Sequence, residues 1–170
     1  MSALTENIVT ALWSKLNVSR VTTLATGGVW YGKAKLSSTY PFVVFEKVSN
    51  VPMYTFQNTV IAEDSLWAVK VFIDRDASTT KSPTGLGEEI LAAAKTAIGN
   101  ALTISGADDW AVYWTQELPE IKQPISDRNI WMMGFLLRVV AADSDAATYN
   151  VTFGAGNNLT FGAGNNLTFN

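Results

Sequence analysis

The segment TYPFVVFEKVSNVP, residues 39–52, gives the clearest indication of how this 170-residue chain folds. Pro41 opens a run of aromatic and β-branched residues, and proline is tolerated at the start of a strand because its missing N–H is not needed there. Pro52 closes the same run. We therefore expect a β-strand between the two prolines, and the neighbouring segments have to pack against it.

The residues that follow, MYTFQNTVIAEDSLWAVKVFIDRD at 53–76, predict a hairpin. From Leu66 to Ile73 the side chains alternate with the period of two that places one set on each face of a sheet. Residues 62–65 are mostly small and polar, which is typical of a turn. The hairpin is therefore expected to turn at 62–65.

Two segments have the periodicity of helices. Apolar side chains recur every four residues over 5–16, and Thr5 is placed to cap that short helix. A longer helix is expected from about Leu86, with alanine, leucine and isoleucine at helical spacing. Glycine, serine and threonine dominate residues 17–39, which favours a loop around a short strand at 29–31.

The last part of the main region predicts two more strands. Aromatic and aliphatic side chains alternate over 109–117, a loop holding Pro119 and Pro124 follows, and the final strand is expected at 131–142. Together the segments predict an α+β domain: an antiparallel sheet of four or five strands with one long and one short helix packed on it.

At Asp143 the composition shifts to Asp, Ala, Thr, Gly and Asn, so we place a domain at 1–142 and an extension at 143–170. The extension repeats the phrase NLTFGAGN with a period of eight. An even period keeps every copy on the same face of an extended chain. The copies are expected to form small hairpins, to lie against a neighbouring subunit's sheet edge, or to remain a flexible duplication.

The composition argues against most chemical functions. The chain has no His and no Cys, which removes a Ser–His nucleophile and thiolate metal sites. The net charge is −3, and no cluster of basic residues is present to bind nucleic acid tightly. The longest apolar run is interrupted by Arg138 and is too short for a bilayer, and the N-terminal residues lack the pattern of a signal peptide. We expect no enzyme, no cofactor, no metal and no membrane contact.

Two motifs resemble ligand sites but fail in detail. GGVWYGKA at 27–34 follows a phosphate-binding loop until its last position, where Ala34 replaces the Ser or Thr that holds magnesium. Asp74 and Asp76 begin like a calcium loop, but Thr79 stands where that loop needs glycine. Both segments are better explained as ordinary loops.

The phrase VWYGKAKLSSTYPFVVFEKVSNVP at 29–52 resembles the tail terminator, or tail-completion, proteins of long-tailed bacteriophages. The likeness lies in a short N-terminal helix, a glycine-bounded V-x-Y phrase and a proline followed by an aromatic and β-branched run. It continues through LWAVKVFID, a polar loop, an alanine-rich helix and a final strand. It covers about residues 3–142.

The resemblance implies a small α+β protomer that assembles with itself, commonly as a hexameric ring, on the head-proximal end of the tail tube. Such a ring ends growth of the tube protein and meets the connector, or stopper, of the head. Its place is the virion, after assembly in the host cytoplasm. DNA would pass through without specific binding. Another neck or head–tail adaptor component is the nearest alternative, and an adhesion module that works through its repeats is a further one.

Several residues are candidates for subunit or partner contacts. Two aromatic residues near 55 fit an interface or a core, because aromatic side chains dominate both. The polar loop at 74–83 fits a contact surface or a solvated loop. The repeats add one phenylalanine per copy. The candidates are Tyr54, Phe56, Asp74, Arg75, Asp76, Phe153, Phe161 and Phe169.

Overall fold

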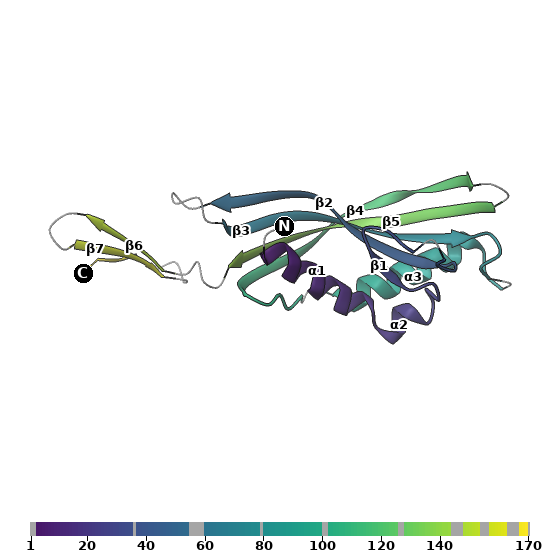
Figure 1. The fold of residues 1–170 in the computed structure, drawn as a ribbon, viewed down its shortest axis with the longest axis horizontal. Coiled ribbons are helices and arrows are strands. Elements are labelled where there is room, and N and C mark those ends of the chain that lie inside the picture. Colours follow the sequence, from purple (N-terminus) through teal and green to yellow (C-terminus); the bar gives the residue numbers. More distant parts are fainter. Residues whose placement is uncertain are drawn as a thin grey trace.

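The computed structural model describes residues 3–35, 37–54, 60–78, 80–99, 102–125, 128–143, 148–153, 157–162 and 167–169. Figure 1 shows an elongated molecule in which long strands form one sheet and the helices lie on one side of it. This two-layer arrangement is that of an α+β domain, as the sequence predicts.

The main sheet contains five strands in the order β1-β2-β3-β5-β4. Their bounds are Val29–Tyr31 for β1, Phe42–Tyr54 for β2, Val60–Asp74 for β3, Ala107–Ile125 for β4 and Arg128–Asp143 for β5. Neighbouring strands from β2 to β4 are antiparallel, but β1 runs parallel to β2. The sheet is therefore mixed, and the prediction of a purely antiparallel sheet is wrong because a three-residue strand carries no signal for its direction.

Three helices accompany the sheet: α1 at Ala3–Leu16, α2 at Ser19–Thr22 and α3 at Pro83–Ile98. The predicted contrast between one long and one short helix is wrong, since α1 has 14 residues and α3 has 16. The helix α3 begins earlier than predicted because Ser82 caps it, accepting a hydrogen bond from the backbone N–H of Gly85 at 3.1 Å. The short helix α2 falls in a segment predicted as loop.

The hydrophobic core fills the space between the helices and one face of the sheet. Alternate residues of β2, β3 and β5 point into it, in agreement with the period of two. Burial of each large apolar side chain stabilises the fold by roughly 1.5–3 kcal/mol. Fully buried members from strands and helices include Phe45, Trp67, Phe135, Leu137, Ile8, Leu12 and Ile90.

One glycine sets how closely α3 approaches the sheet. A Cβ atom on Gly87 would lie 2.3 Å from Sδ of Met133 and 2.7 Å from Cδ1 of Ile73. Both distances are too short for real atoms, so with any larger residue at this position the buried ends of Met133 and Ile73 would have to shift. Gly87 therefore serves helix–sheet packing.

The strand β2 continues through Pro52, where the sequence predicted its end. Residues 43 and 45 direct their backbone groups to the β1 side, since the Val43 N–H donates to the Gly28 carbonyl and the Phe45 carbonyl accepts from Gly32 N–H. The register shift after Lys47 reverses this alternation. Pro52 thus faces the free edge of the sheet, where its missing N–H costs no ladder hydrogen bond.

Two further predicted loops are strand. Residues 62–65, expected as the hairpin turn, lie inside β3 and pair with β2 and β5. The segment with Pro119 and Pro124, expected as a loop, belongs to β4. That strand lies at the edge of the sheet and shifts register between Leu118 and Ile121, which accommodates proline.

The extension forms a second, three-stranded antiparallel sheet, here called the tail sheet. Its strands are β6 at Thr148–Phe153, β7 at Asn157–Gly162 and β8 at Leu167–Phe169. Each strand contains one copy of the V/L-T-F triplet. Of the three arrangements that the sequence left open, the structure has the hairpins.

Candidate interaction surfaces

The sheet face opposite the helices, here called the open face, is defined by the strand register. Residues Trp67, Val69, Val71 and Ile73 of β3 point to the helices, so the even-numbered residues of β3 point the other way. Their partners on β2, β5 and β4 share that direction. In this strand order of β2, β3, β5 and β4, the rows are Phe42–Phe72–Met132–Ile121, Val44–Lys70–Gly134–Leu118, Glu46–Ala68–Leu136–Gln116, Ser49–Leu66–Arg138–Tyr113, Val51–Asp64–Val140–Ala111 and Met53–Ala62–Ala142.

Most residues in these rows are apolar, and no described helix packs over them, as Figure 1 shows. The most exposed ones gather where β5 ends: Val51 is 61% exposed, Tyr113 53% and Met53 46%. Tyr54 follows Met53 at the end of β2 and is 54% exposed. Val51 and Met53 lie on β2 and Tyr113 lies on β4, with the Asp64–Arg138 pair between them, so the exposed apolar side chains form two groups on one face. Exposed large apolar side chains are typical of a surface that another polypeptide covers.

The charged side chains described in these rows neutralise each other. Lys70 pairs with Glu46, and Arg138 pairs with Asp64. The hydrogen bond from Arg138 lowers the pKa of the Asp64 carboxyl, and it outweighs the effect of partial burial, which raises that pKa. Both pairs join neighbouring strands, so a partner could cover the open face without supplying matching charges.

On the helix side, a buried polar cluster fixes α1 to the sheet. Glu63 and Thr5 are both fully buried. The Thr5 hydroxyl donates to Oε2 of Glu63 at 2.6 Å and accepts from Nζ of Lys47 at 3.2 Å. Thr5 was expected as a helix cap, but it lies inside α1 and contacts the sheet instead. A cluster satisfied in this way positions the helix.

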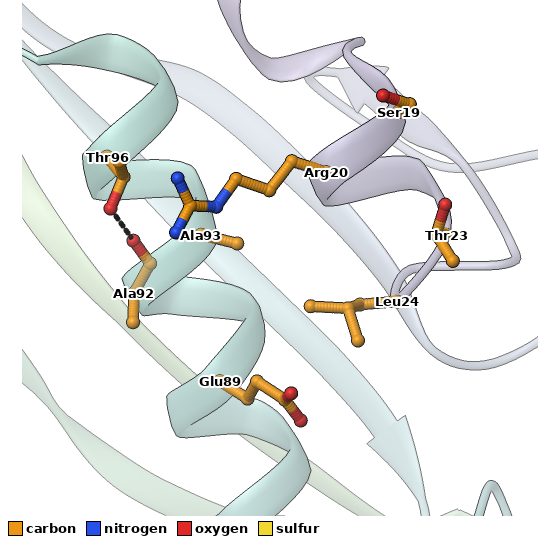
Figure 2. Close-up of a pocket in the computed structure, with 8 residues that line it drawn as sticks. All are labelled: Ser19, Arg20, Thr23, Leu24, Glu89, Ala92, Ala93 and Thr96. Atoms are coloured by element: carbon orange, nitrogen blue, oxygen red, sulfur yellow. Dashed lines mark hydrogen bonds between the residues drawn. The ribbon is translucent and has the colours of Figure 1, made fainter.

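A shallow groove of about 540 Å³ lies between α2 and α3, and Figure 2 shows the side chains that line it. The Arg20 guanidinium extends from α2 toward α3. Glu89 lies on α3, closer to the N-terminal end of that helix than Ala92 and Thr96. Glu89 already forms an ion pair with Lys81. The groove offers one cation among hydroxyl and alanine side chains, without a pair of groups suited to acid–base catalysis. Its lining residues are Ser19, Arg20, Thr23, Leu24, Glu89, Ala92, Ala93 and Thr96.

The predicted contact residues do not come together in one place. Tyr54 ends β2, whereas Asp74 ends β3 at the opposite end of the sheet. The fifteen residues of β3 separate the two regions by about 50 Å at the usual rise per residue. Arg75 and Asp76 are exposed in the turn after β3, where the Arg75 N–H donates to the Asn129 carbonyl. Phe56 lies outside the described residues.

The three tail phenylalanines occupy related register positions. In the tail sheet, Tyr149 pairs with Phe161 and Val151 with Leu159, while Phe161 also pairs with Leu167 and Leu159 with Phe169. Phe153 pairs with Asn157. All of these are odd-numbered positions, and the even-numbered ones between them are Thr, Asn and Gly. Apolar and polar residue types therefore alternate along the sequence of the three strands.

Comparison with known proteins does not assign this chain to a family. No protein-family model matches the chain, and no curated protein matches it in sequence. In the part of the chain that the structure describes, no group of three His, Cys, Asp or Glu side chains could hold a metal ion. Among the described helices, none is long and apolar enough to cross a membrane.

The sequence did not reveal the open face or the Thr5–Glu63 contact. Both depend on which strands are neighbours, and local patterns do not encode strand order. The alternation of residue types in β3 does indicate that this strand has two different faces. From Leu66 to Ile73 one face is wholly apolar, and the other includes Lys70.

Proposed function

We propose that this chain is a structural protein of a long-tailed bacteriophage virion, forming a ring at the head-proximal end of the tail tube. The ring ends tube growth and joins the tail to the head connector. The observation that carries the proposal is the open face, an apolar sheet surface whose charges are already paired within the chain. Such a surface suits stable binding to protein.

The order of elements supports the choice of family. Helix α1, the short strand β1, the long β2–β3 hairpin, helix α3 and the β4–β5 pair follow one another as in tail terminator proteins. The helix α2 is an addition to that order. The Pro41 phrase that carries the resemblance forms the start of β2, next to β1.

The geometry also supports assembly into a closed ring. A ring needs two different contact regions on each subunit, because every copy binds one neighbour with each of them. Exposed apolar residues around Tyr54 and the polar turn at Asp74 lie at opposite ends of β3. Binding alone performs the proposed function, and it requires no chemical step.

Gel filtration with light scattering and negative-stain imaging of the purified full-length chain tests the assembly. We expect annular particles of uniform diameter with the mass of about six chains. The variant Tyr113→Asp places an unpaired charge on the open face. We expect it to shift the population from rings toward smaller species. A monomer at all concentrations, with and without tail tube protein, would contradict the proposed ring.

A further inference from the structure

We propose that the main sheet continues from one copy of this chain to the next, with residues 110–114 of β4 pairing antiparallel with residues 48–52 of β2 in the neighbouring copy. This inference rests on the proposed ring and names the contact that joins its subunits. The partner is a second copy of the chain, and the binding mode is strand addition at a sheet edge.

The two edge strands β2 and β4 carry most of the exposed large apolar side chains among the described residues. Tyr113 pairs with Arg138 on the open face, whereas its neighbour Trp114 pairs with Leu137, which points to the helices. A layer stacked on one face would cover only one of these two directions, and a strand added at the edge contacts both. The exposed edge residues, each between 38% and 61% exposed, are Val48, Val51, Met53, Tyr54, Tyr113, Trp114 and Ile121.

Most of the β2 edge is open to such a strand. The strand β1 pairs only with residues 43–45 of β2, and no other described strand lies on that side. Unpaired main-chain N–H and C=O groups along an edge are a template for another strand. Residues 48–54 contain no charged side chain, and Pro52 is the single residue there that discourages pairing.

The outer edge of β4 has an unprotected and a protected half. Residues 110–116 contain neither a charge nor a proline. Residues 117–124 contain three charged side chains and two prolines, and the register shifts between Leu118 and Ile121. Charges, prolines and bulges are the features that keep an edge strand from pairing. The half that lacks them lies level with the open part of β2, since Ala111 and Val51 share a row.

The strand directions make two copies compatible. The four long strands from β2 to β4 alternate in direction, so the two edges of the sheet run in opposite directions. A neighbour that keeps its helices on the same side of the sheet therefore brings its β2 antiparallel to β4. Two different edges meet in each contact, and such a heterologous contact can close a ring.

The main-chain groups of the two edges also match. Pro52 faces the free edge of β2, and the alternation of hydrogen bonds across four strands turns Trp110, in the same row, to the free edge of β4. Asn50 and Val112 share the next row that faces outward. In the proposed contact Asn50 and Val112 exchange two hydrogen bonds, and the Trp110 N–H donates to the Pro52 carbonyl. The missing N–H of Pro52 then costs one hydrogen bond of the ladder.

Disulfide trapping tests the contact, because the natural chain contains no Cys. Val51 and Ala111 of neighbours would form a pair with Cα atoms about 4.5 Å apart, which a disulfide can join. Within one chain β3 and β5 separate them by about 14 Å, which a disulfide cannot span. The full-length chain carrying Val51→Cys and Ala111→Cys is oxidised at a concentration where light scattering detects assembly. We expect a ladder of covalent oligomers on a non-reducing gel.

The matched control carries Val51→Cys and Ile121→Cys. Ile121 is an exposed residue of the same strand and the same face, but it lies in the protected half of β4. We expect no ladder from this variant. Far-ultraviolet circular dichroism shows whether each variant folds.

Proline substitutions give a second readout. Val112→Pro and Lys122→Pro each remove an N–H that points away from β5, so neither breaks the ladder within the chain. We expect Val112→Pro to raise the dissociation constant of the ring about tenfold through the lost hydrogen bond and Lys122→Pro to leave it unchanged.

Annular particles without a ladder would overturn the strand contact and leave the proposed ring. A ladder from particles that are open filaments would keep the contact and contradict the ring. Equal ladders from the two cysteine pairs, or equal effects of the two prolines, would also overturn the inference.

Discussion

Arg138 on β5 holds Asp64 on β3 through two hydrogen bonds, with Nε donating to Oδ1 at 2.7 Å and Nη2 donating to Oδ2. The pair lies in the middle of the exposed end of the open face. It replaces two unpaired charges with a neutral unit, which makes this part of the surface available for an apolar partner.

The pair should make stability depend on pH in the acid range. Hydrogen bonding to Arg138 holds the folded-state pKa of Asp64 below the usual value of 3.8. The contribution to stability is present above 3.8 and is lost as the pH falls through the lower folded-state pKa. Urea unfolding of the natural chain and of Asp64→Asn should therefore differ most near neutral pH and converge in acid. A constant difference across the acid range would refute this assignment.

A side chain at Gly87 should destabilise the fold, because buried neighbours have to shift to make room for it. The Cβ of Gly87→Ala would lie 2.3 Å from Sδ of Met133, so α3 or Met133 has to move. We expect a loss of about 1–3 kcal/mol in the free energy of unfolding, the usual cost of overpacking. In Gly85→Ala the new Cβ meets only Oγ of Ser82 at 3.2 Å, which makes it the control on the same helix. Equal stabilities of the two variants would contradict the close approach.

The buried hydrogen bond between Thr5 and Glu63 should contribute more to the free energy of unfolding than an exposed hydrogen bond does. Thr5→Val removes the hydroxyl that donates to Glu63 and accepts from Lys47. We expect a loss of about 1–3 kcal/mol on thermal or urea unfolding, because a buried polar group loses a partner. Thr10→Val removes only an exposed hydroxyl bonded to the Glu6 carbonyl in the same helix. The contact is unimportant if both variants unfold alike.

The boundary at Asp143 predicts that the main domain folds without its extension. A chain ending at Asp143 keeps all five strands of the main sheet, since β6, β7 and β8 pair only among themselves in the two sheets described. Its unfolding free energy should match that of the monomeric full chain to within about 0.5 kcal/mol. Loss of cooperative unfolding after truncation would show that the boundary is misplaced.

Local sequence patterns predicted the elements whose signals are also local. The alternation from Leu66 to Ile73 and the apolar spacing in α1 and α3 correspond to observed strands and helices. Residues 62–65 were wrongly predicted as a turn because most of them are polar. Two of the polar side chains are buried in β3 and bind partners that are distant in the sequence. Glu63 contacts Thr5, and the Ser65 hydroxyl donates to the Val139 carbonyl at 3.1 Å. A polar residue satisfied by a distant partner looks the same in sequence as a polar residue in a turn.

The candidate surfaces were less predictable than the fold. The sequence suits Tyr54 equally to a core and to an interface. In the structure Tyr54 is 54% exposed, and its role in binding stays a prediction. Nothing in the sequence placed Tyr113 beside Arg138 or Val51 beside Asp64, because those relations follow from the register of four strands. The pairing of Tyr149 with Phe161 could not be read from the eight-residue period, which has Asn157 and Asn165 at the positions equivalent to Tyr149.

The position of this chain in purified phage particles tests the central proposal most directly. An epitope tag after Asn170, detected by gold-labelled antibody in electron micrographs, should mark the junction of tail and head on each particle. Mass spectrometry of the same particles should give about six copies per virion. Particles that carry no copy of the chain, or label found only elsewhere on the virion, would contradict the proposed function.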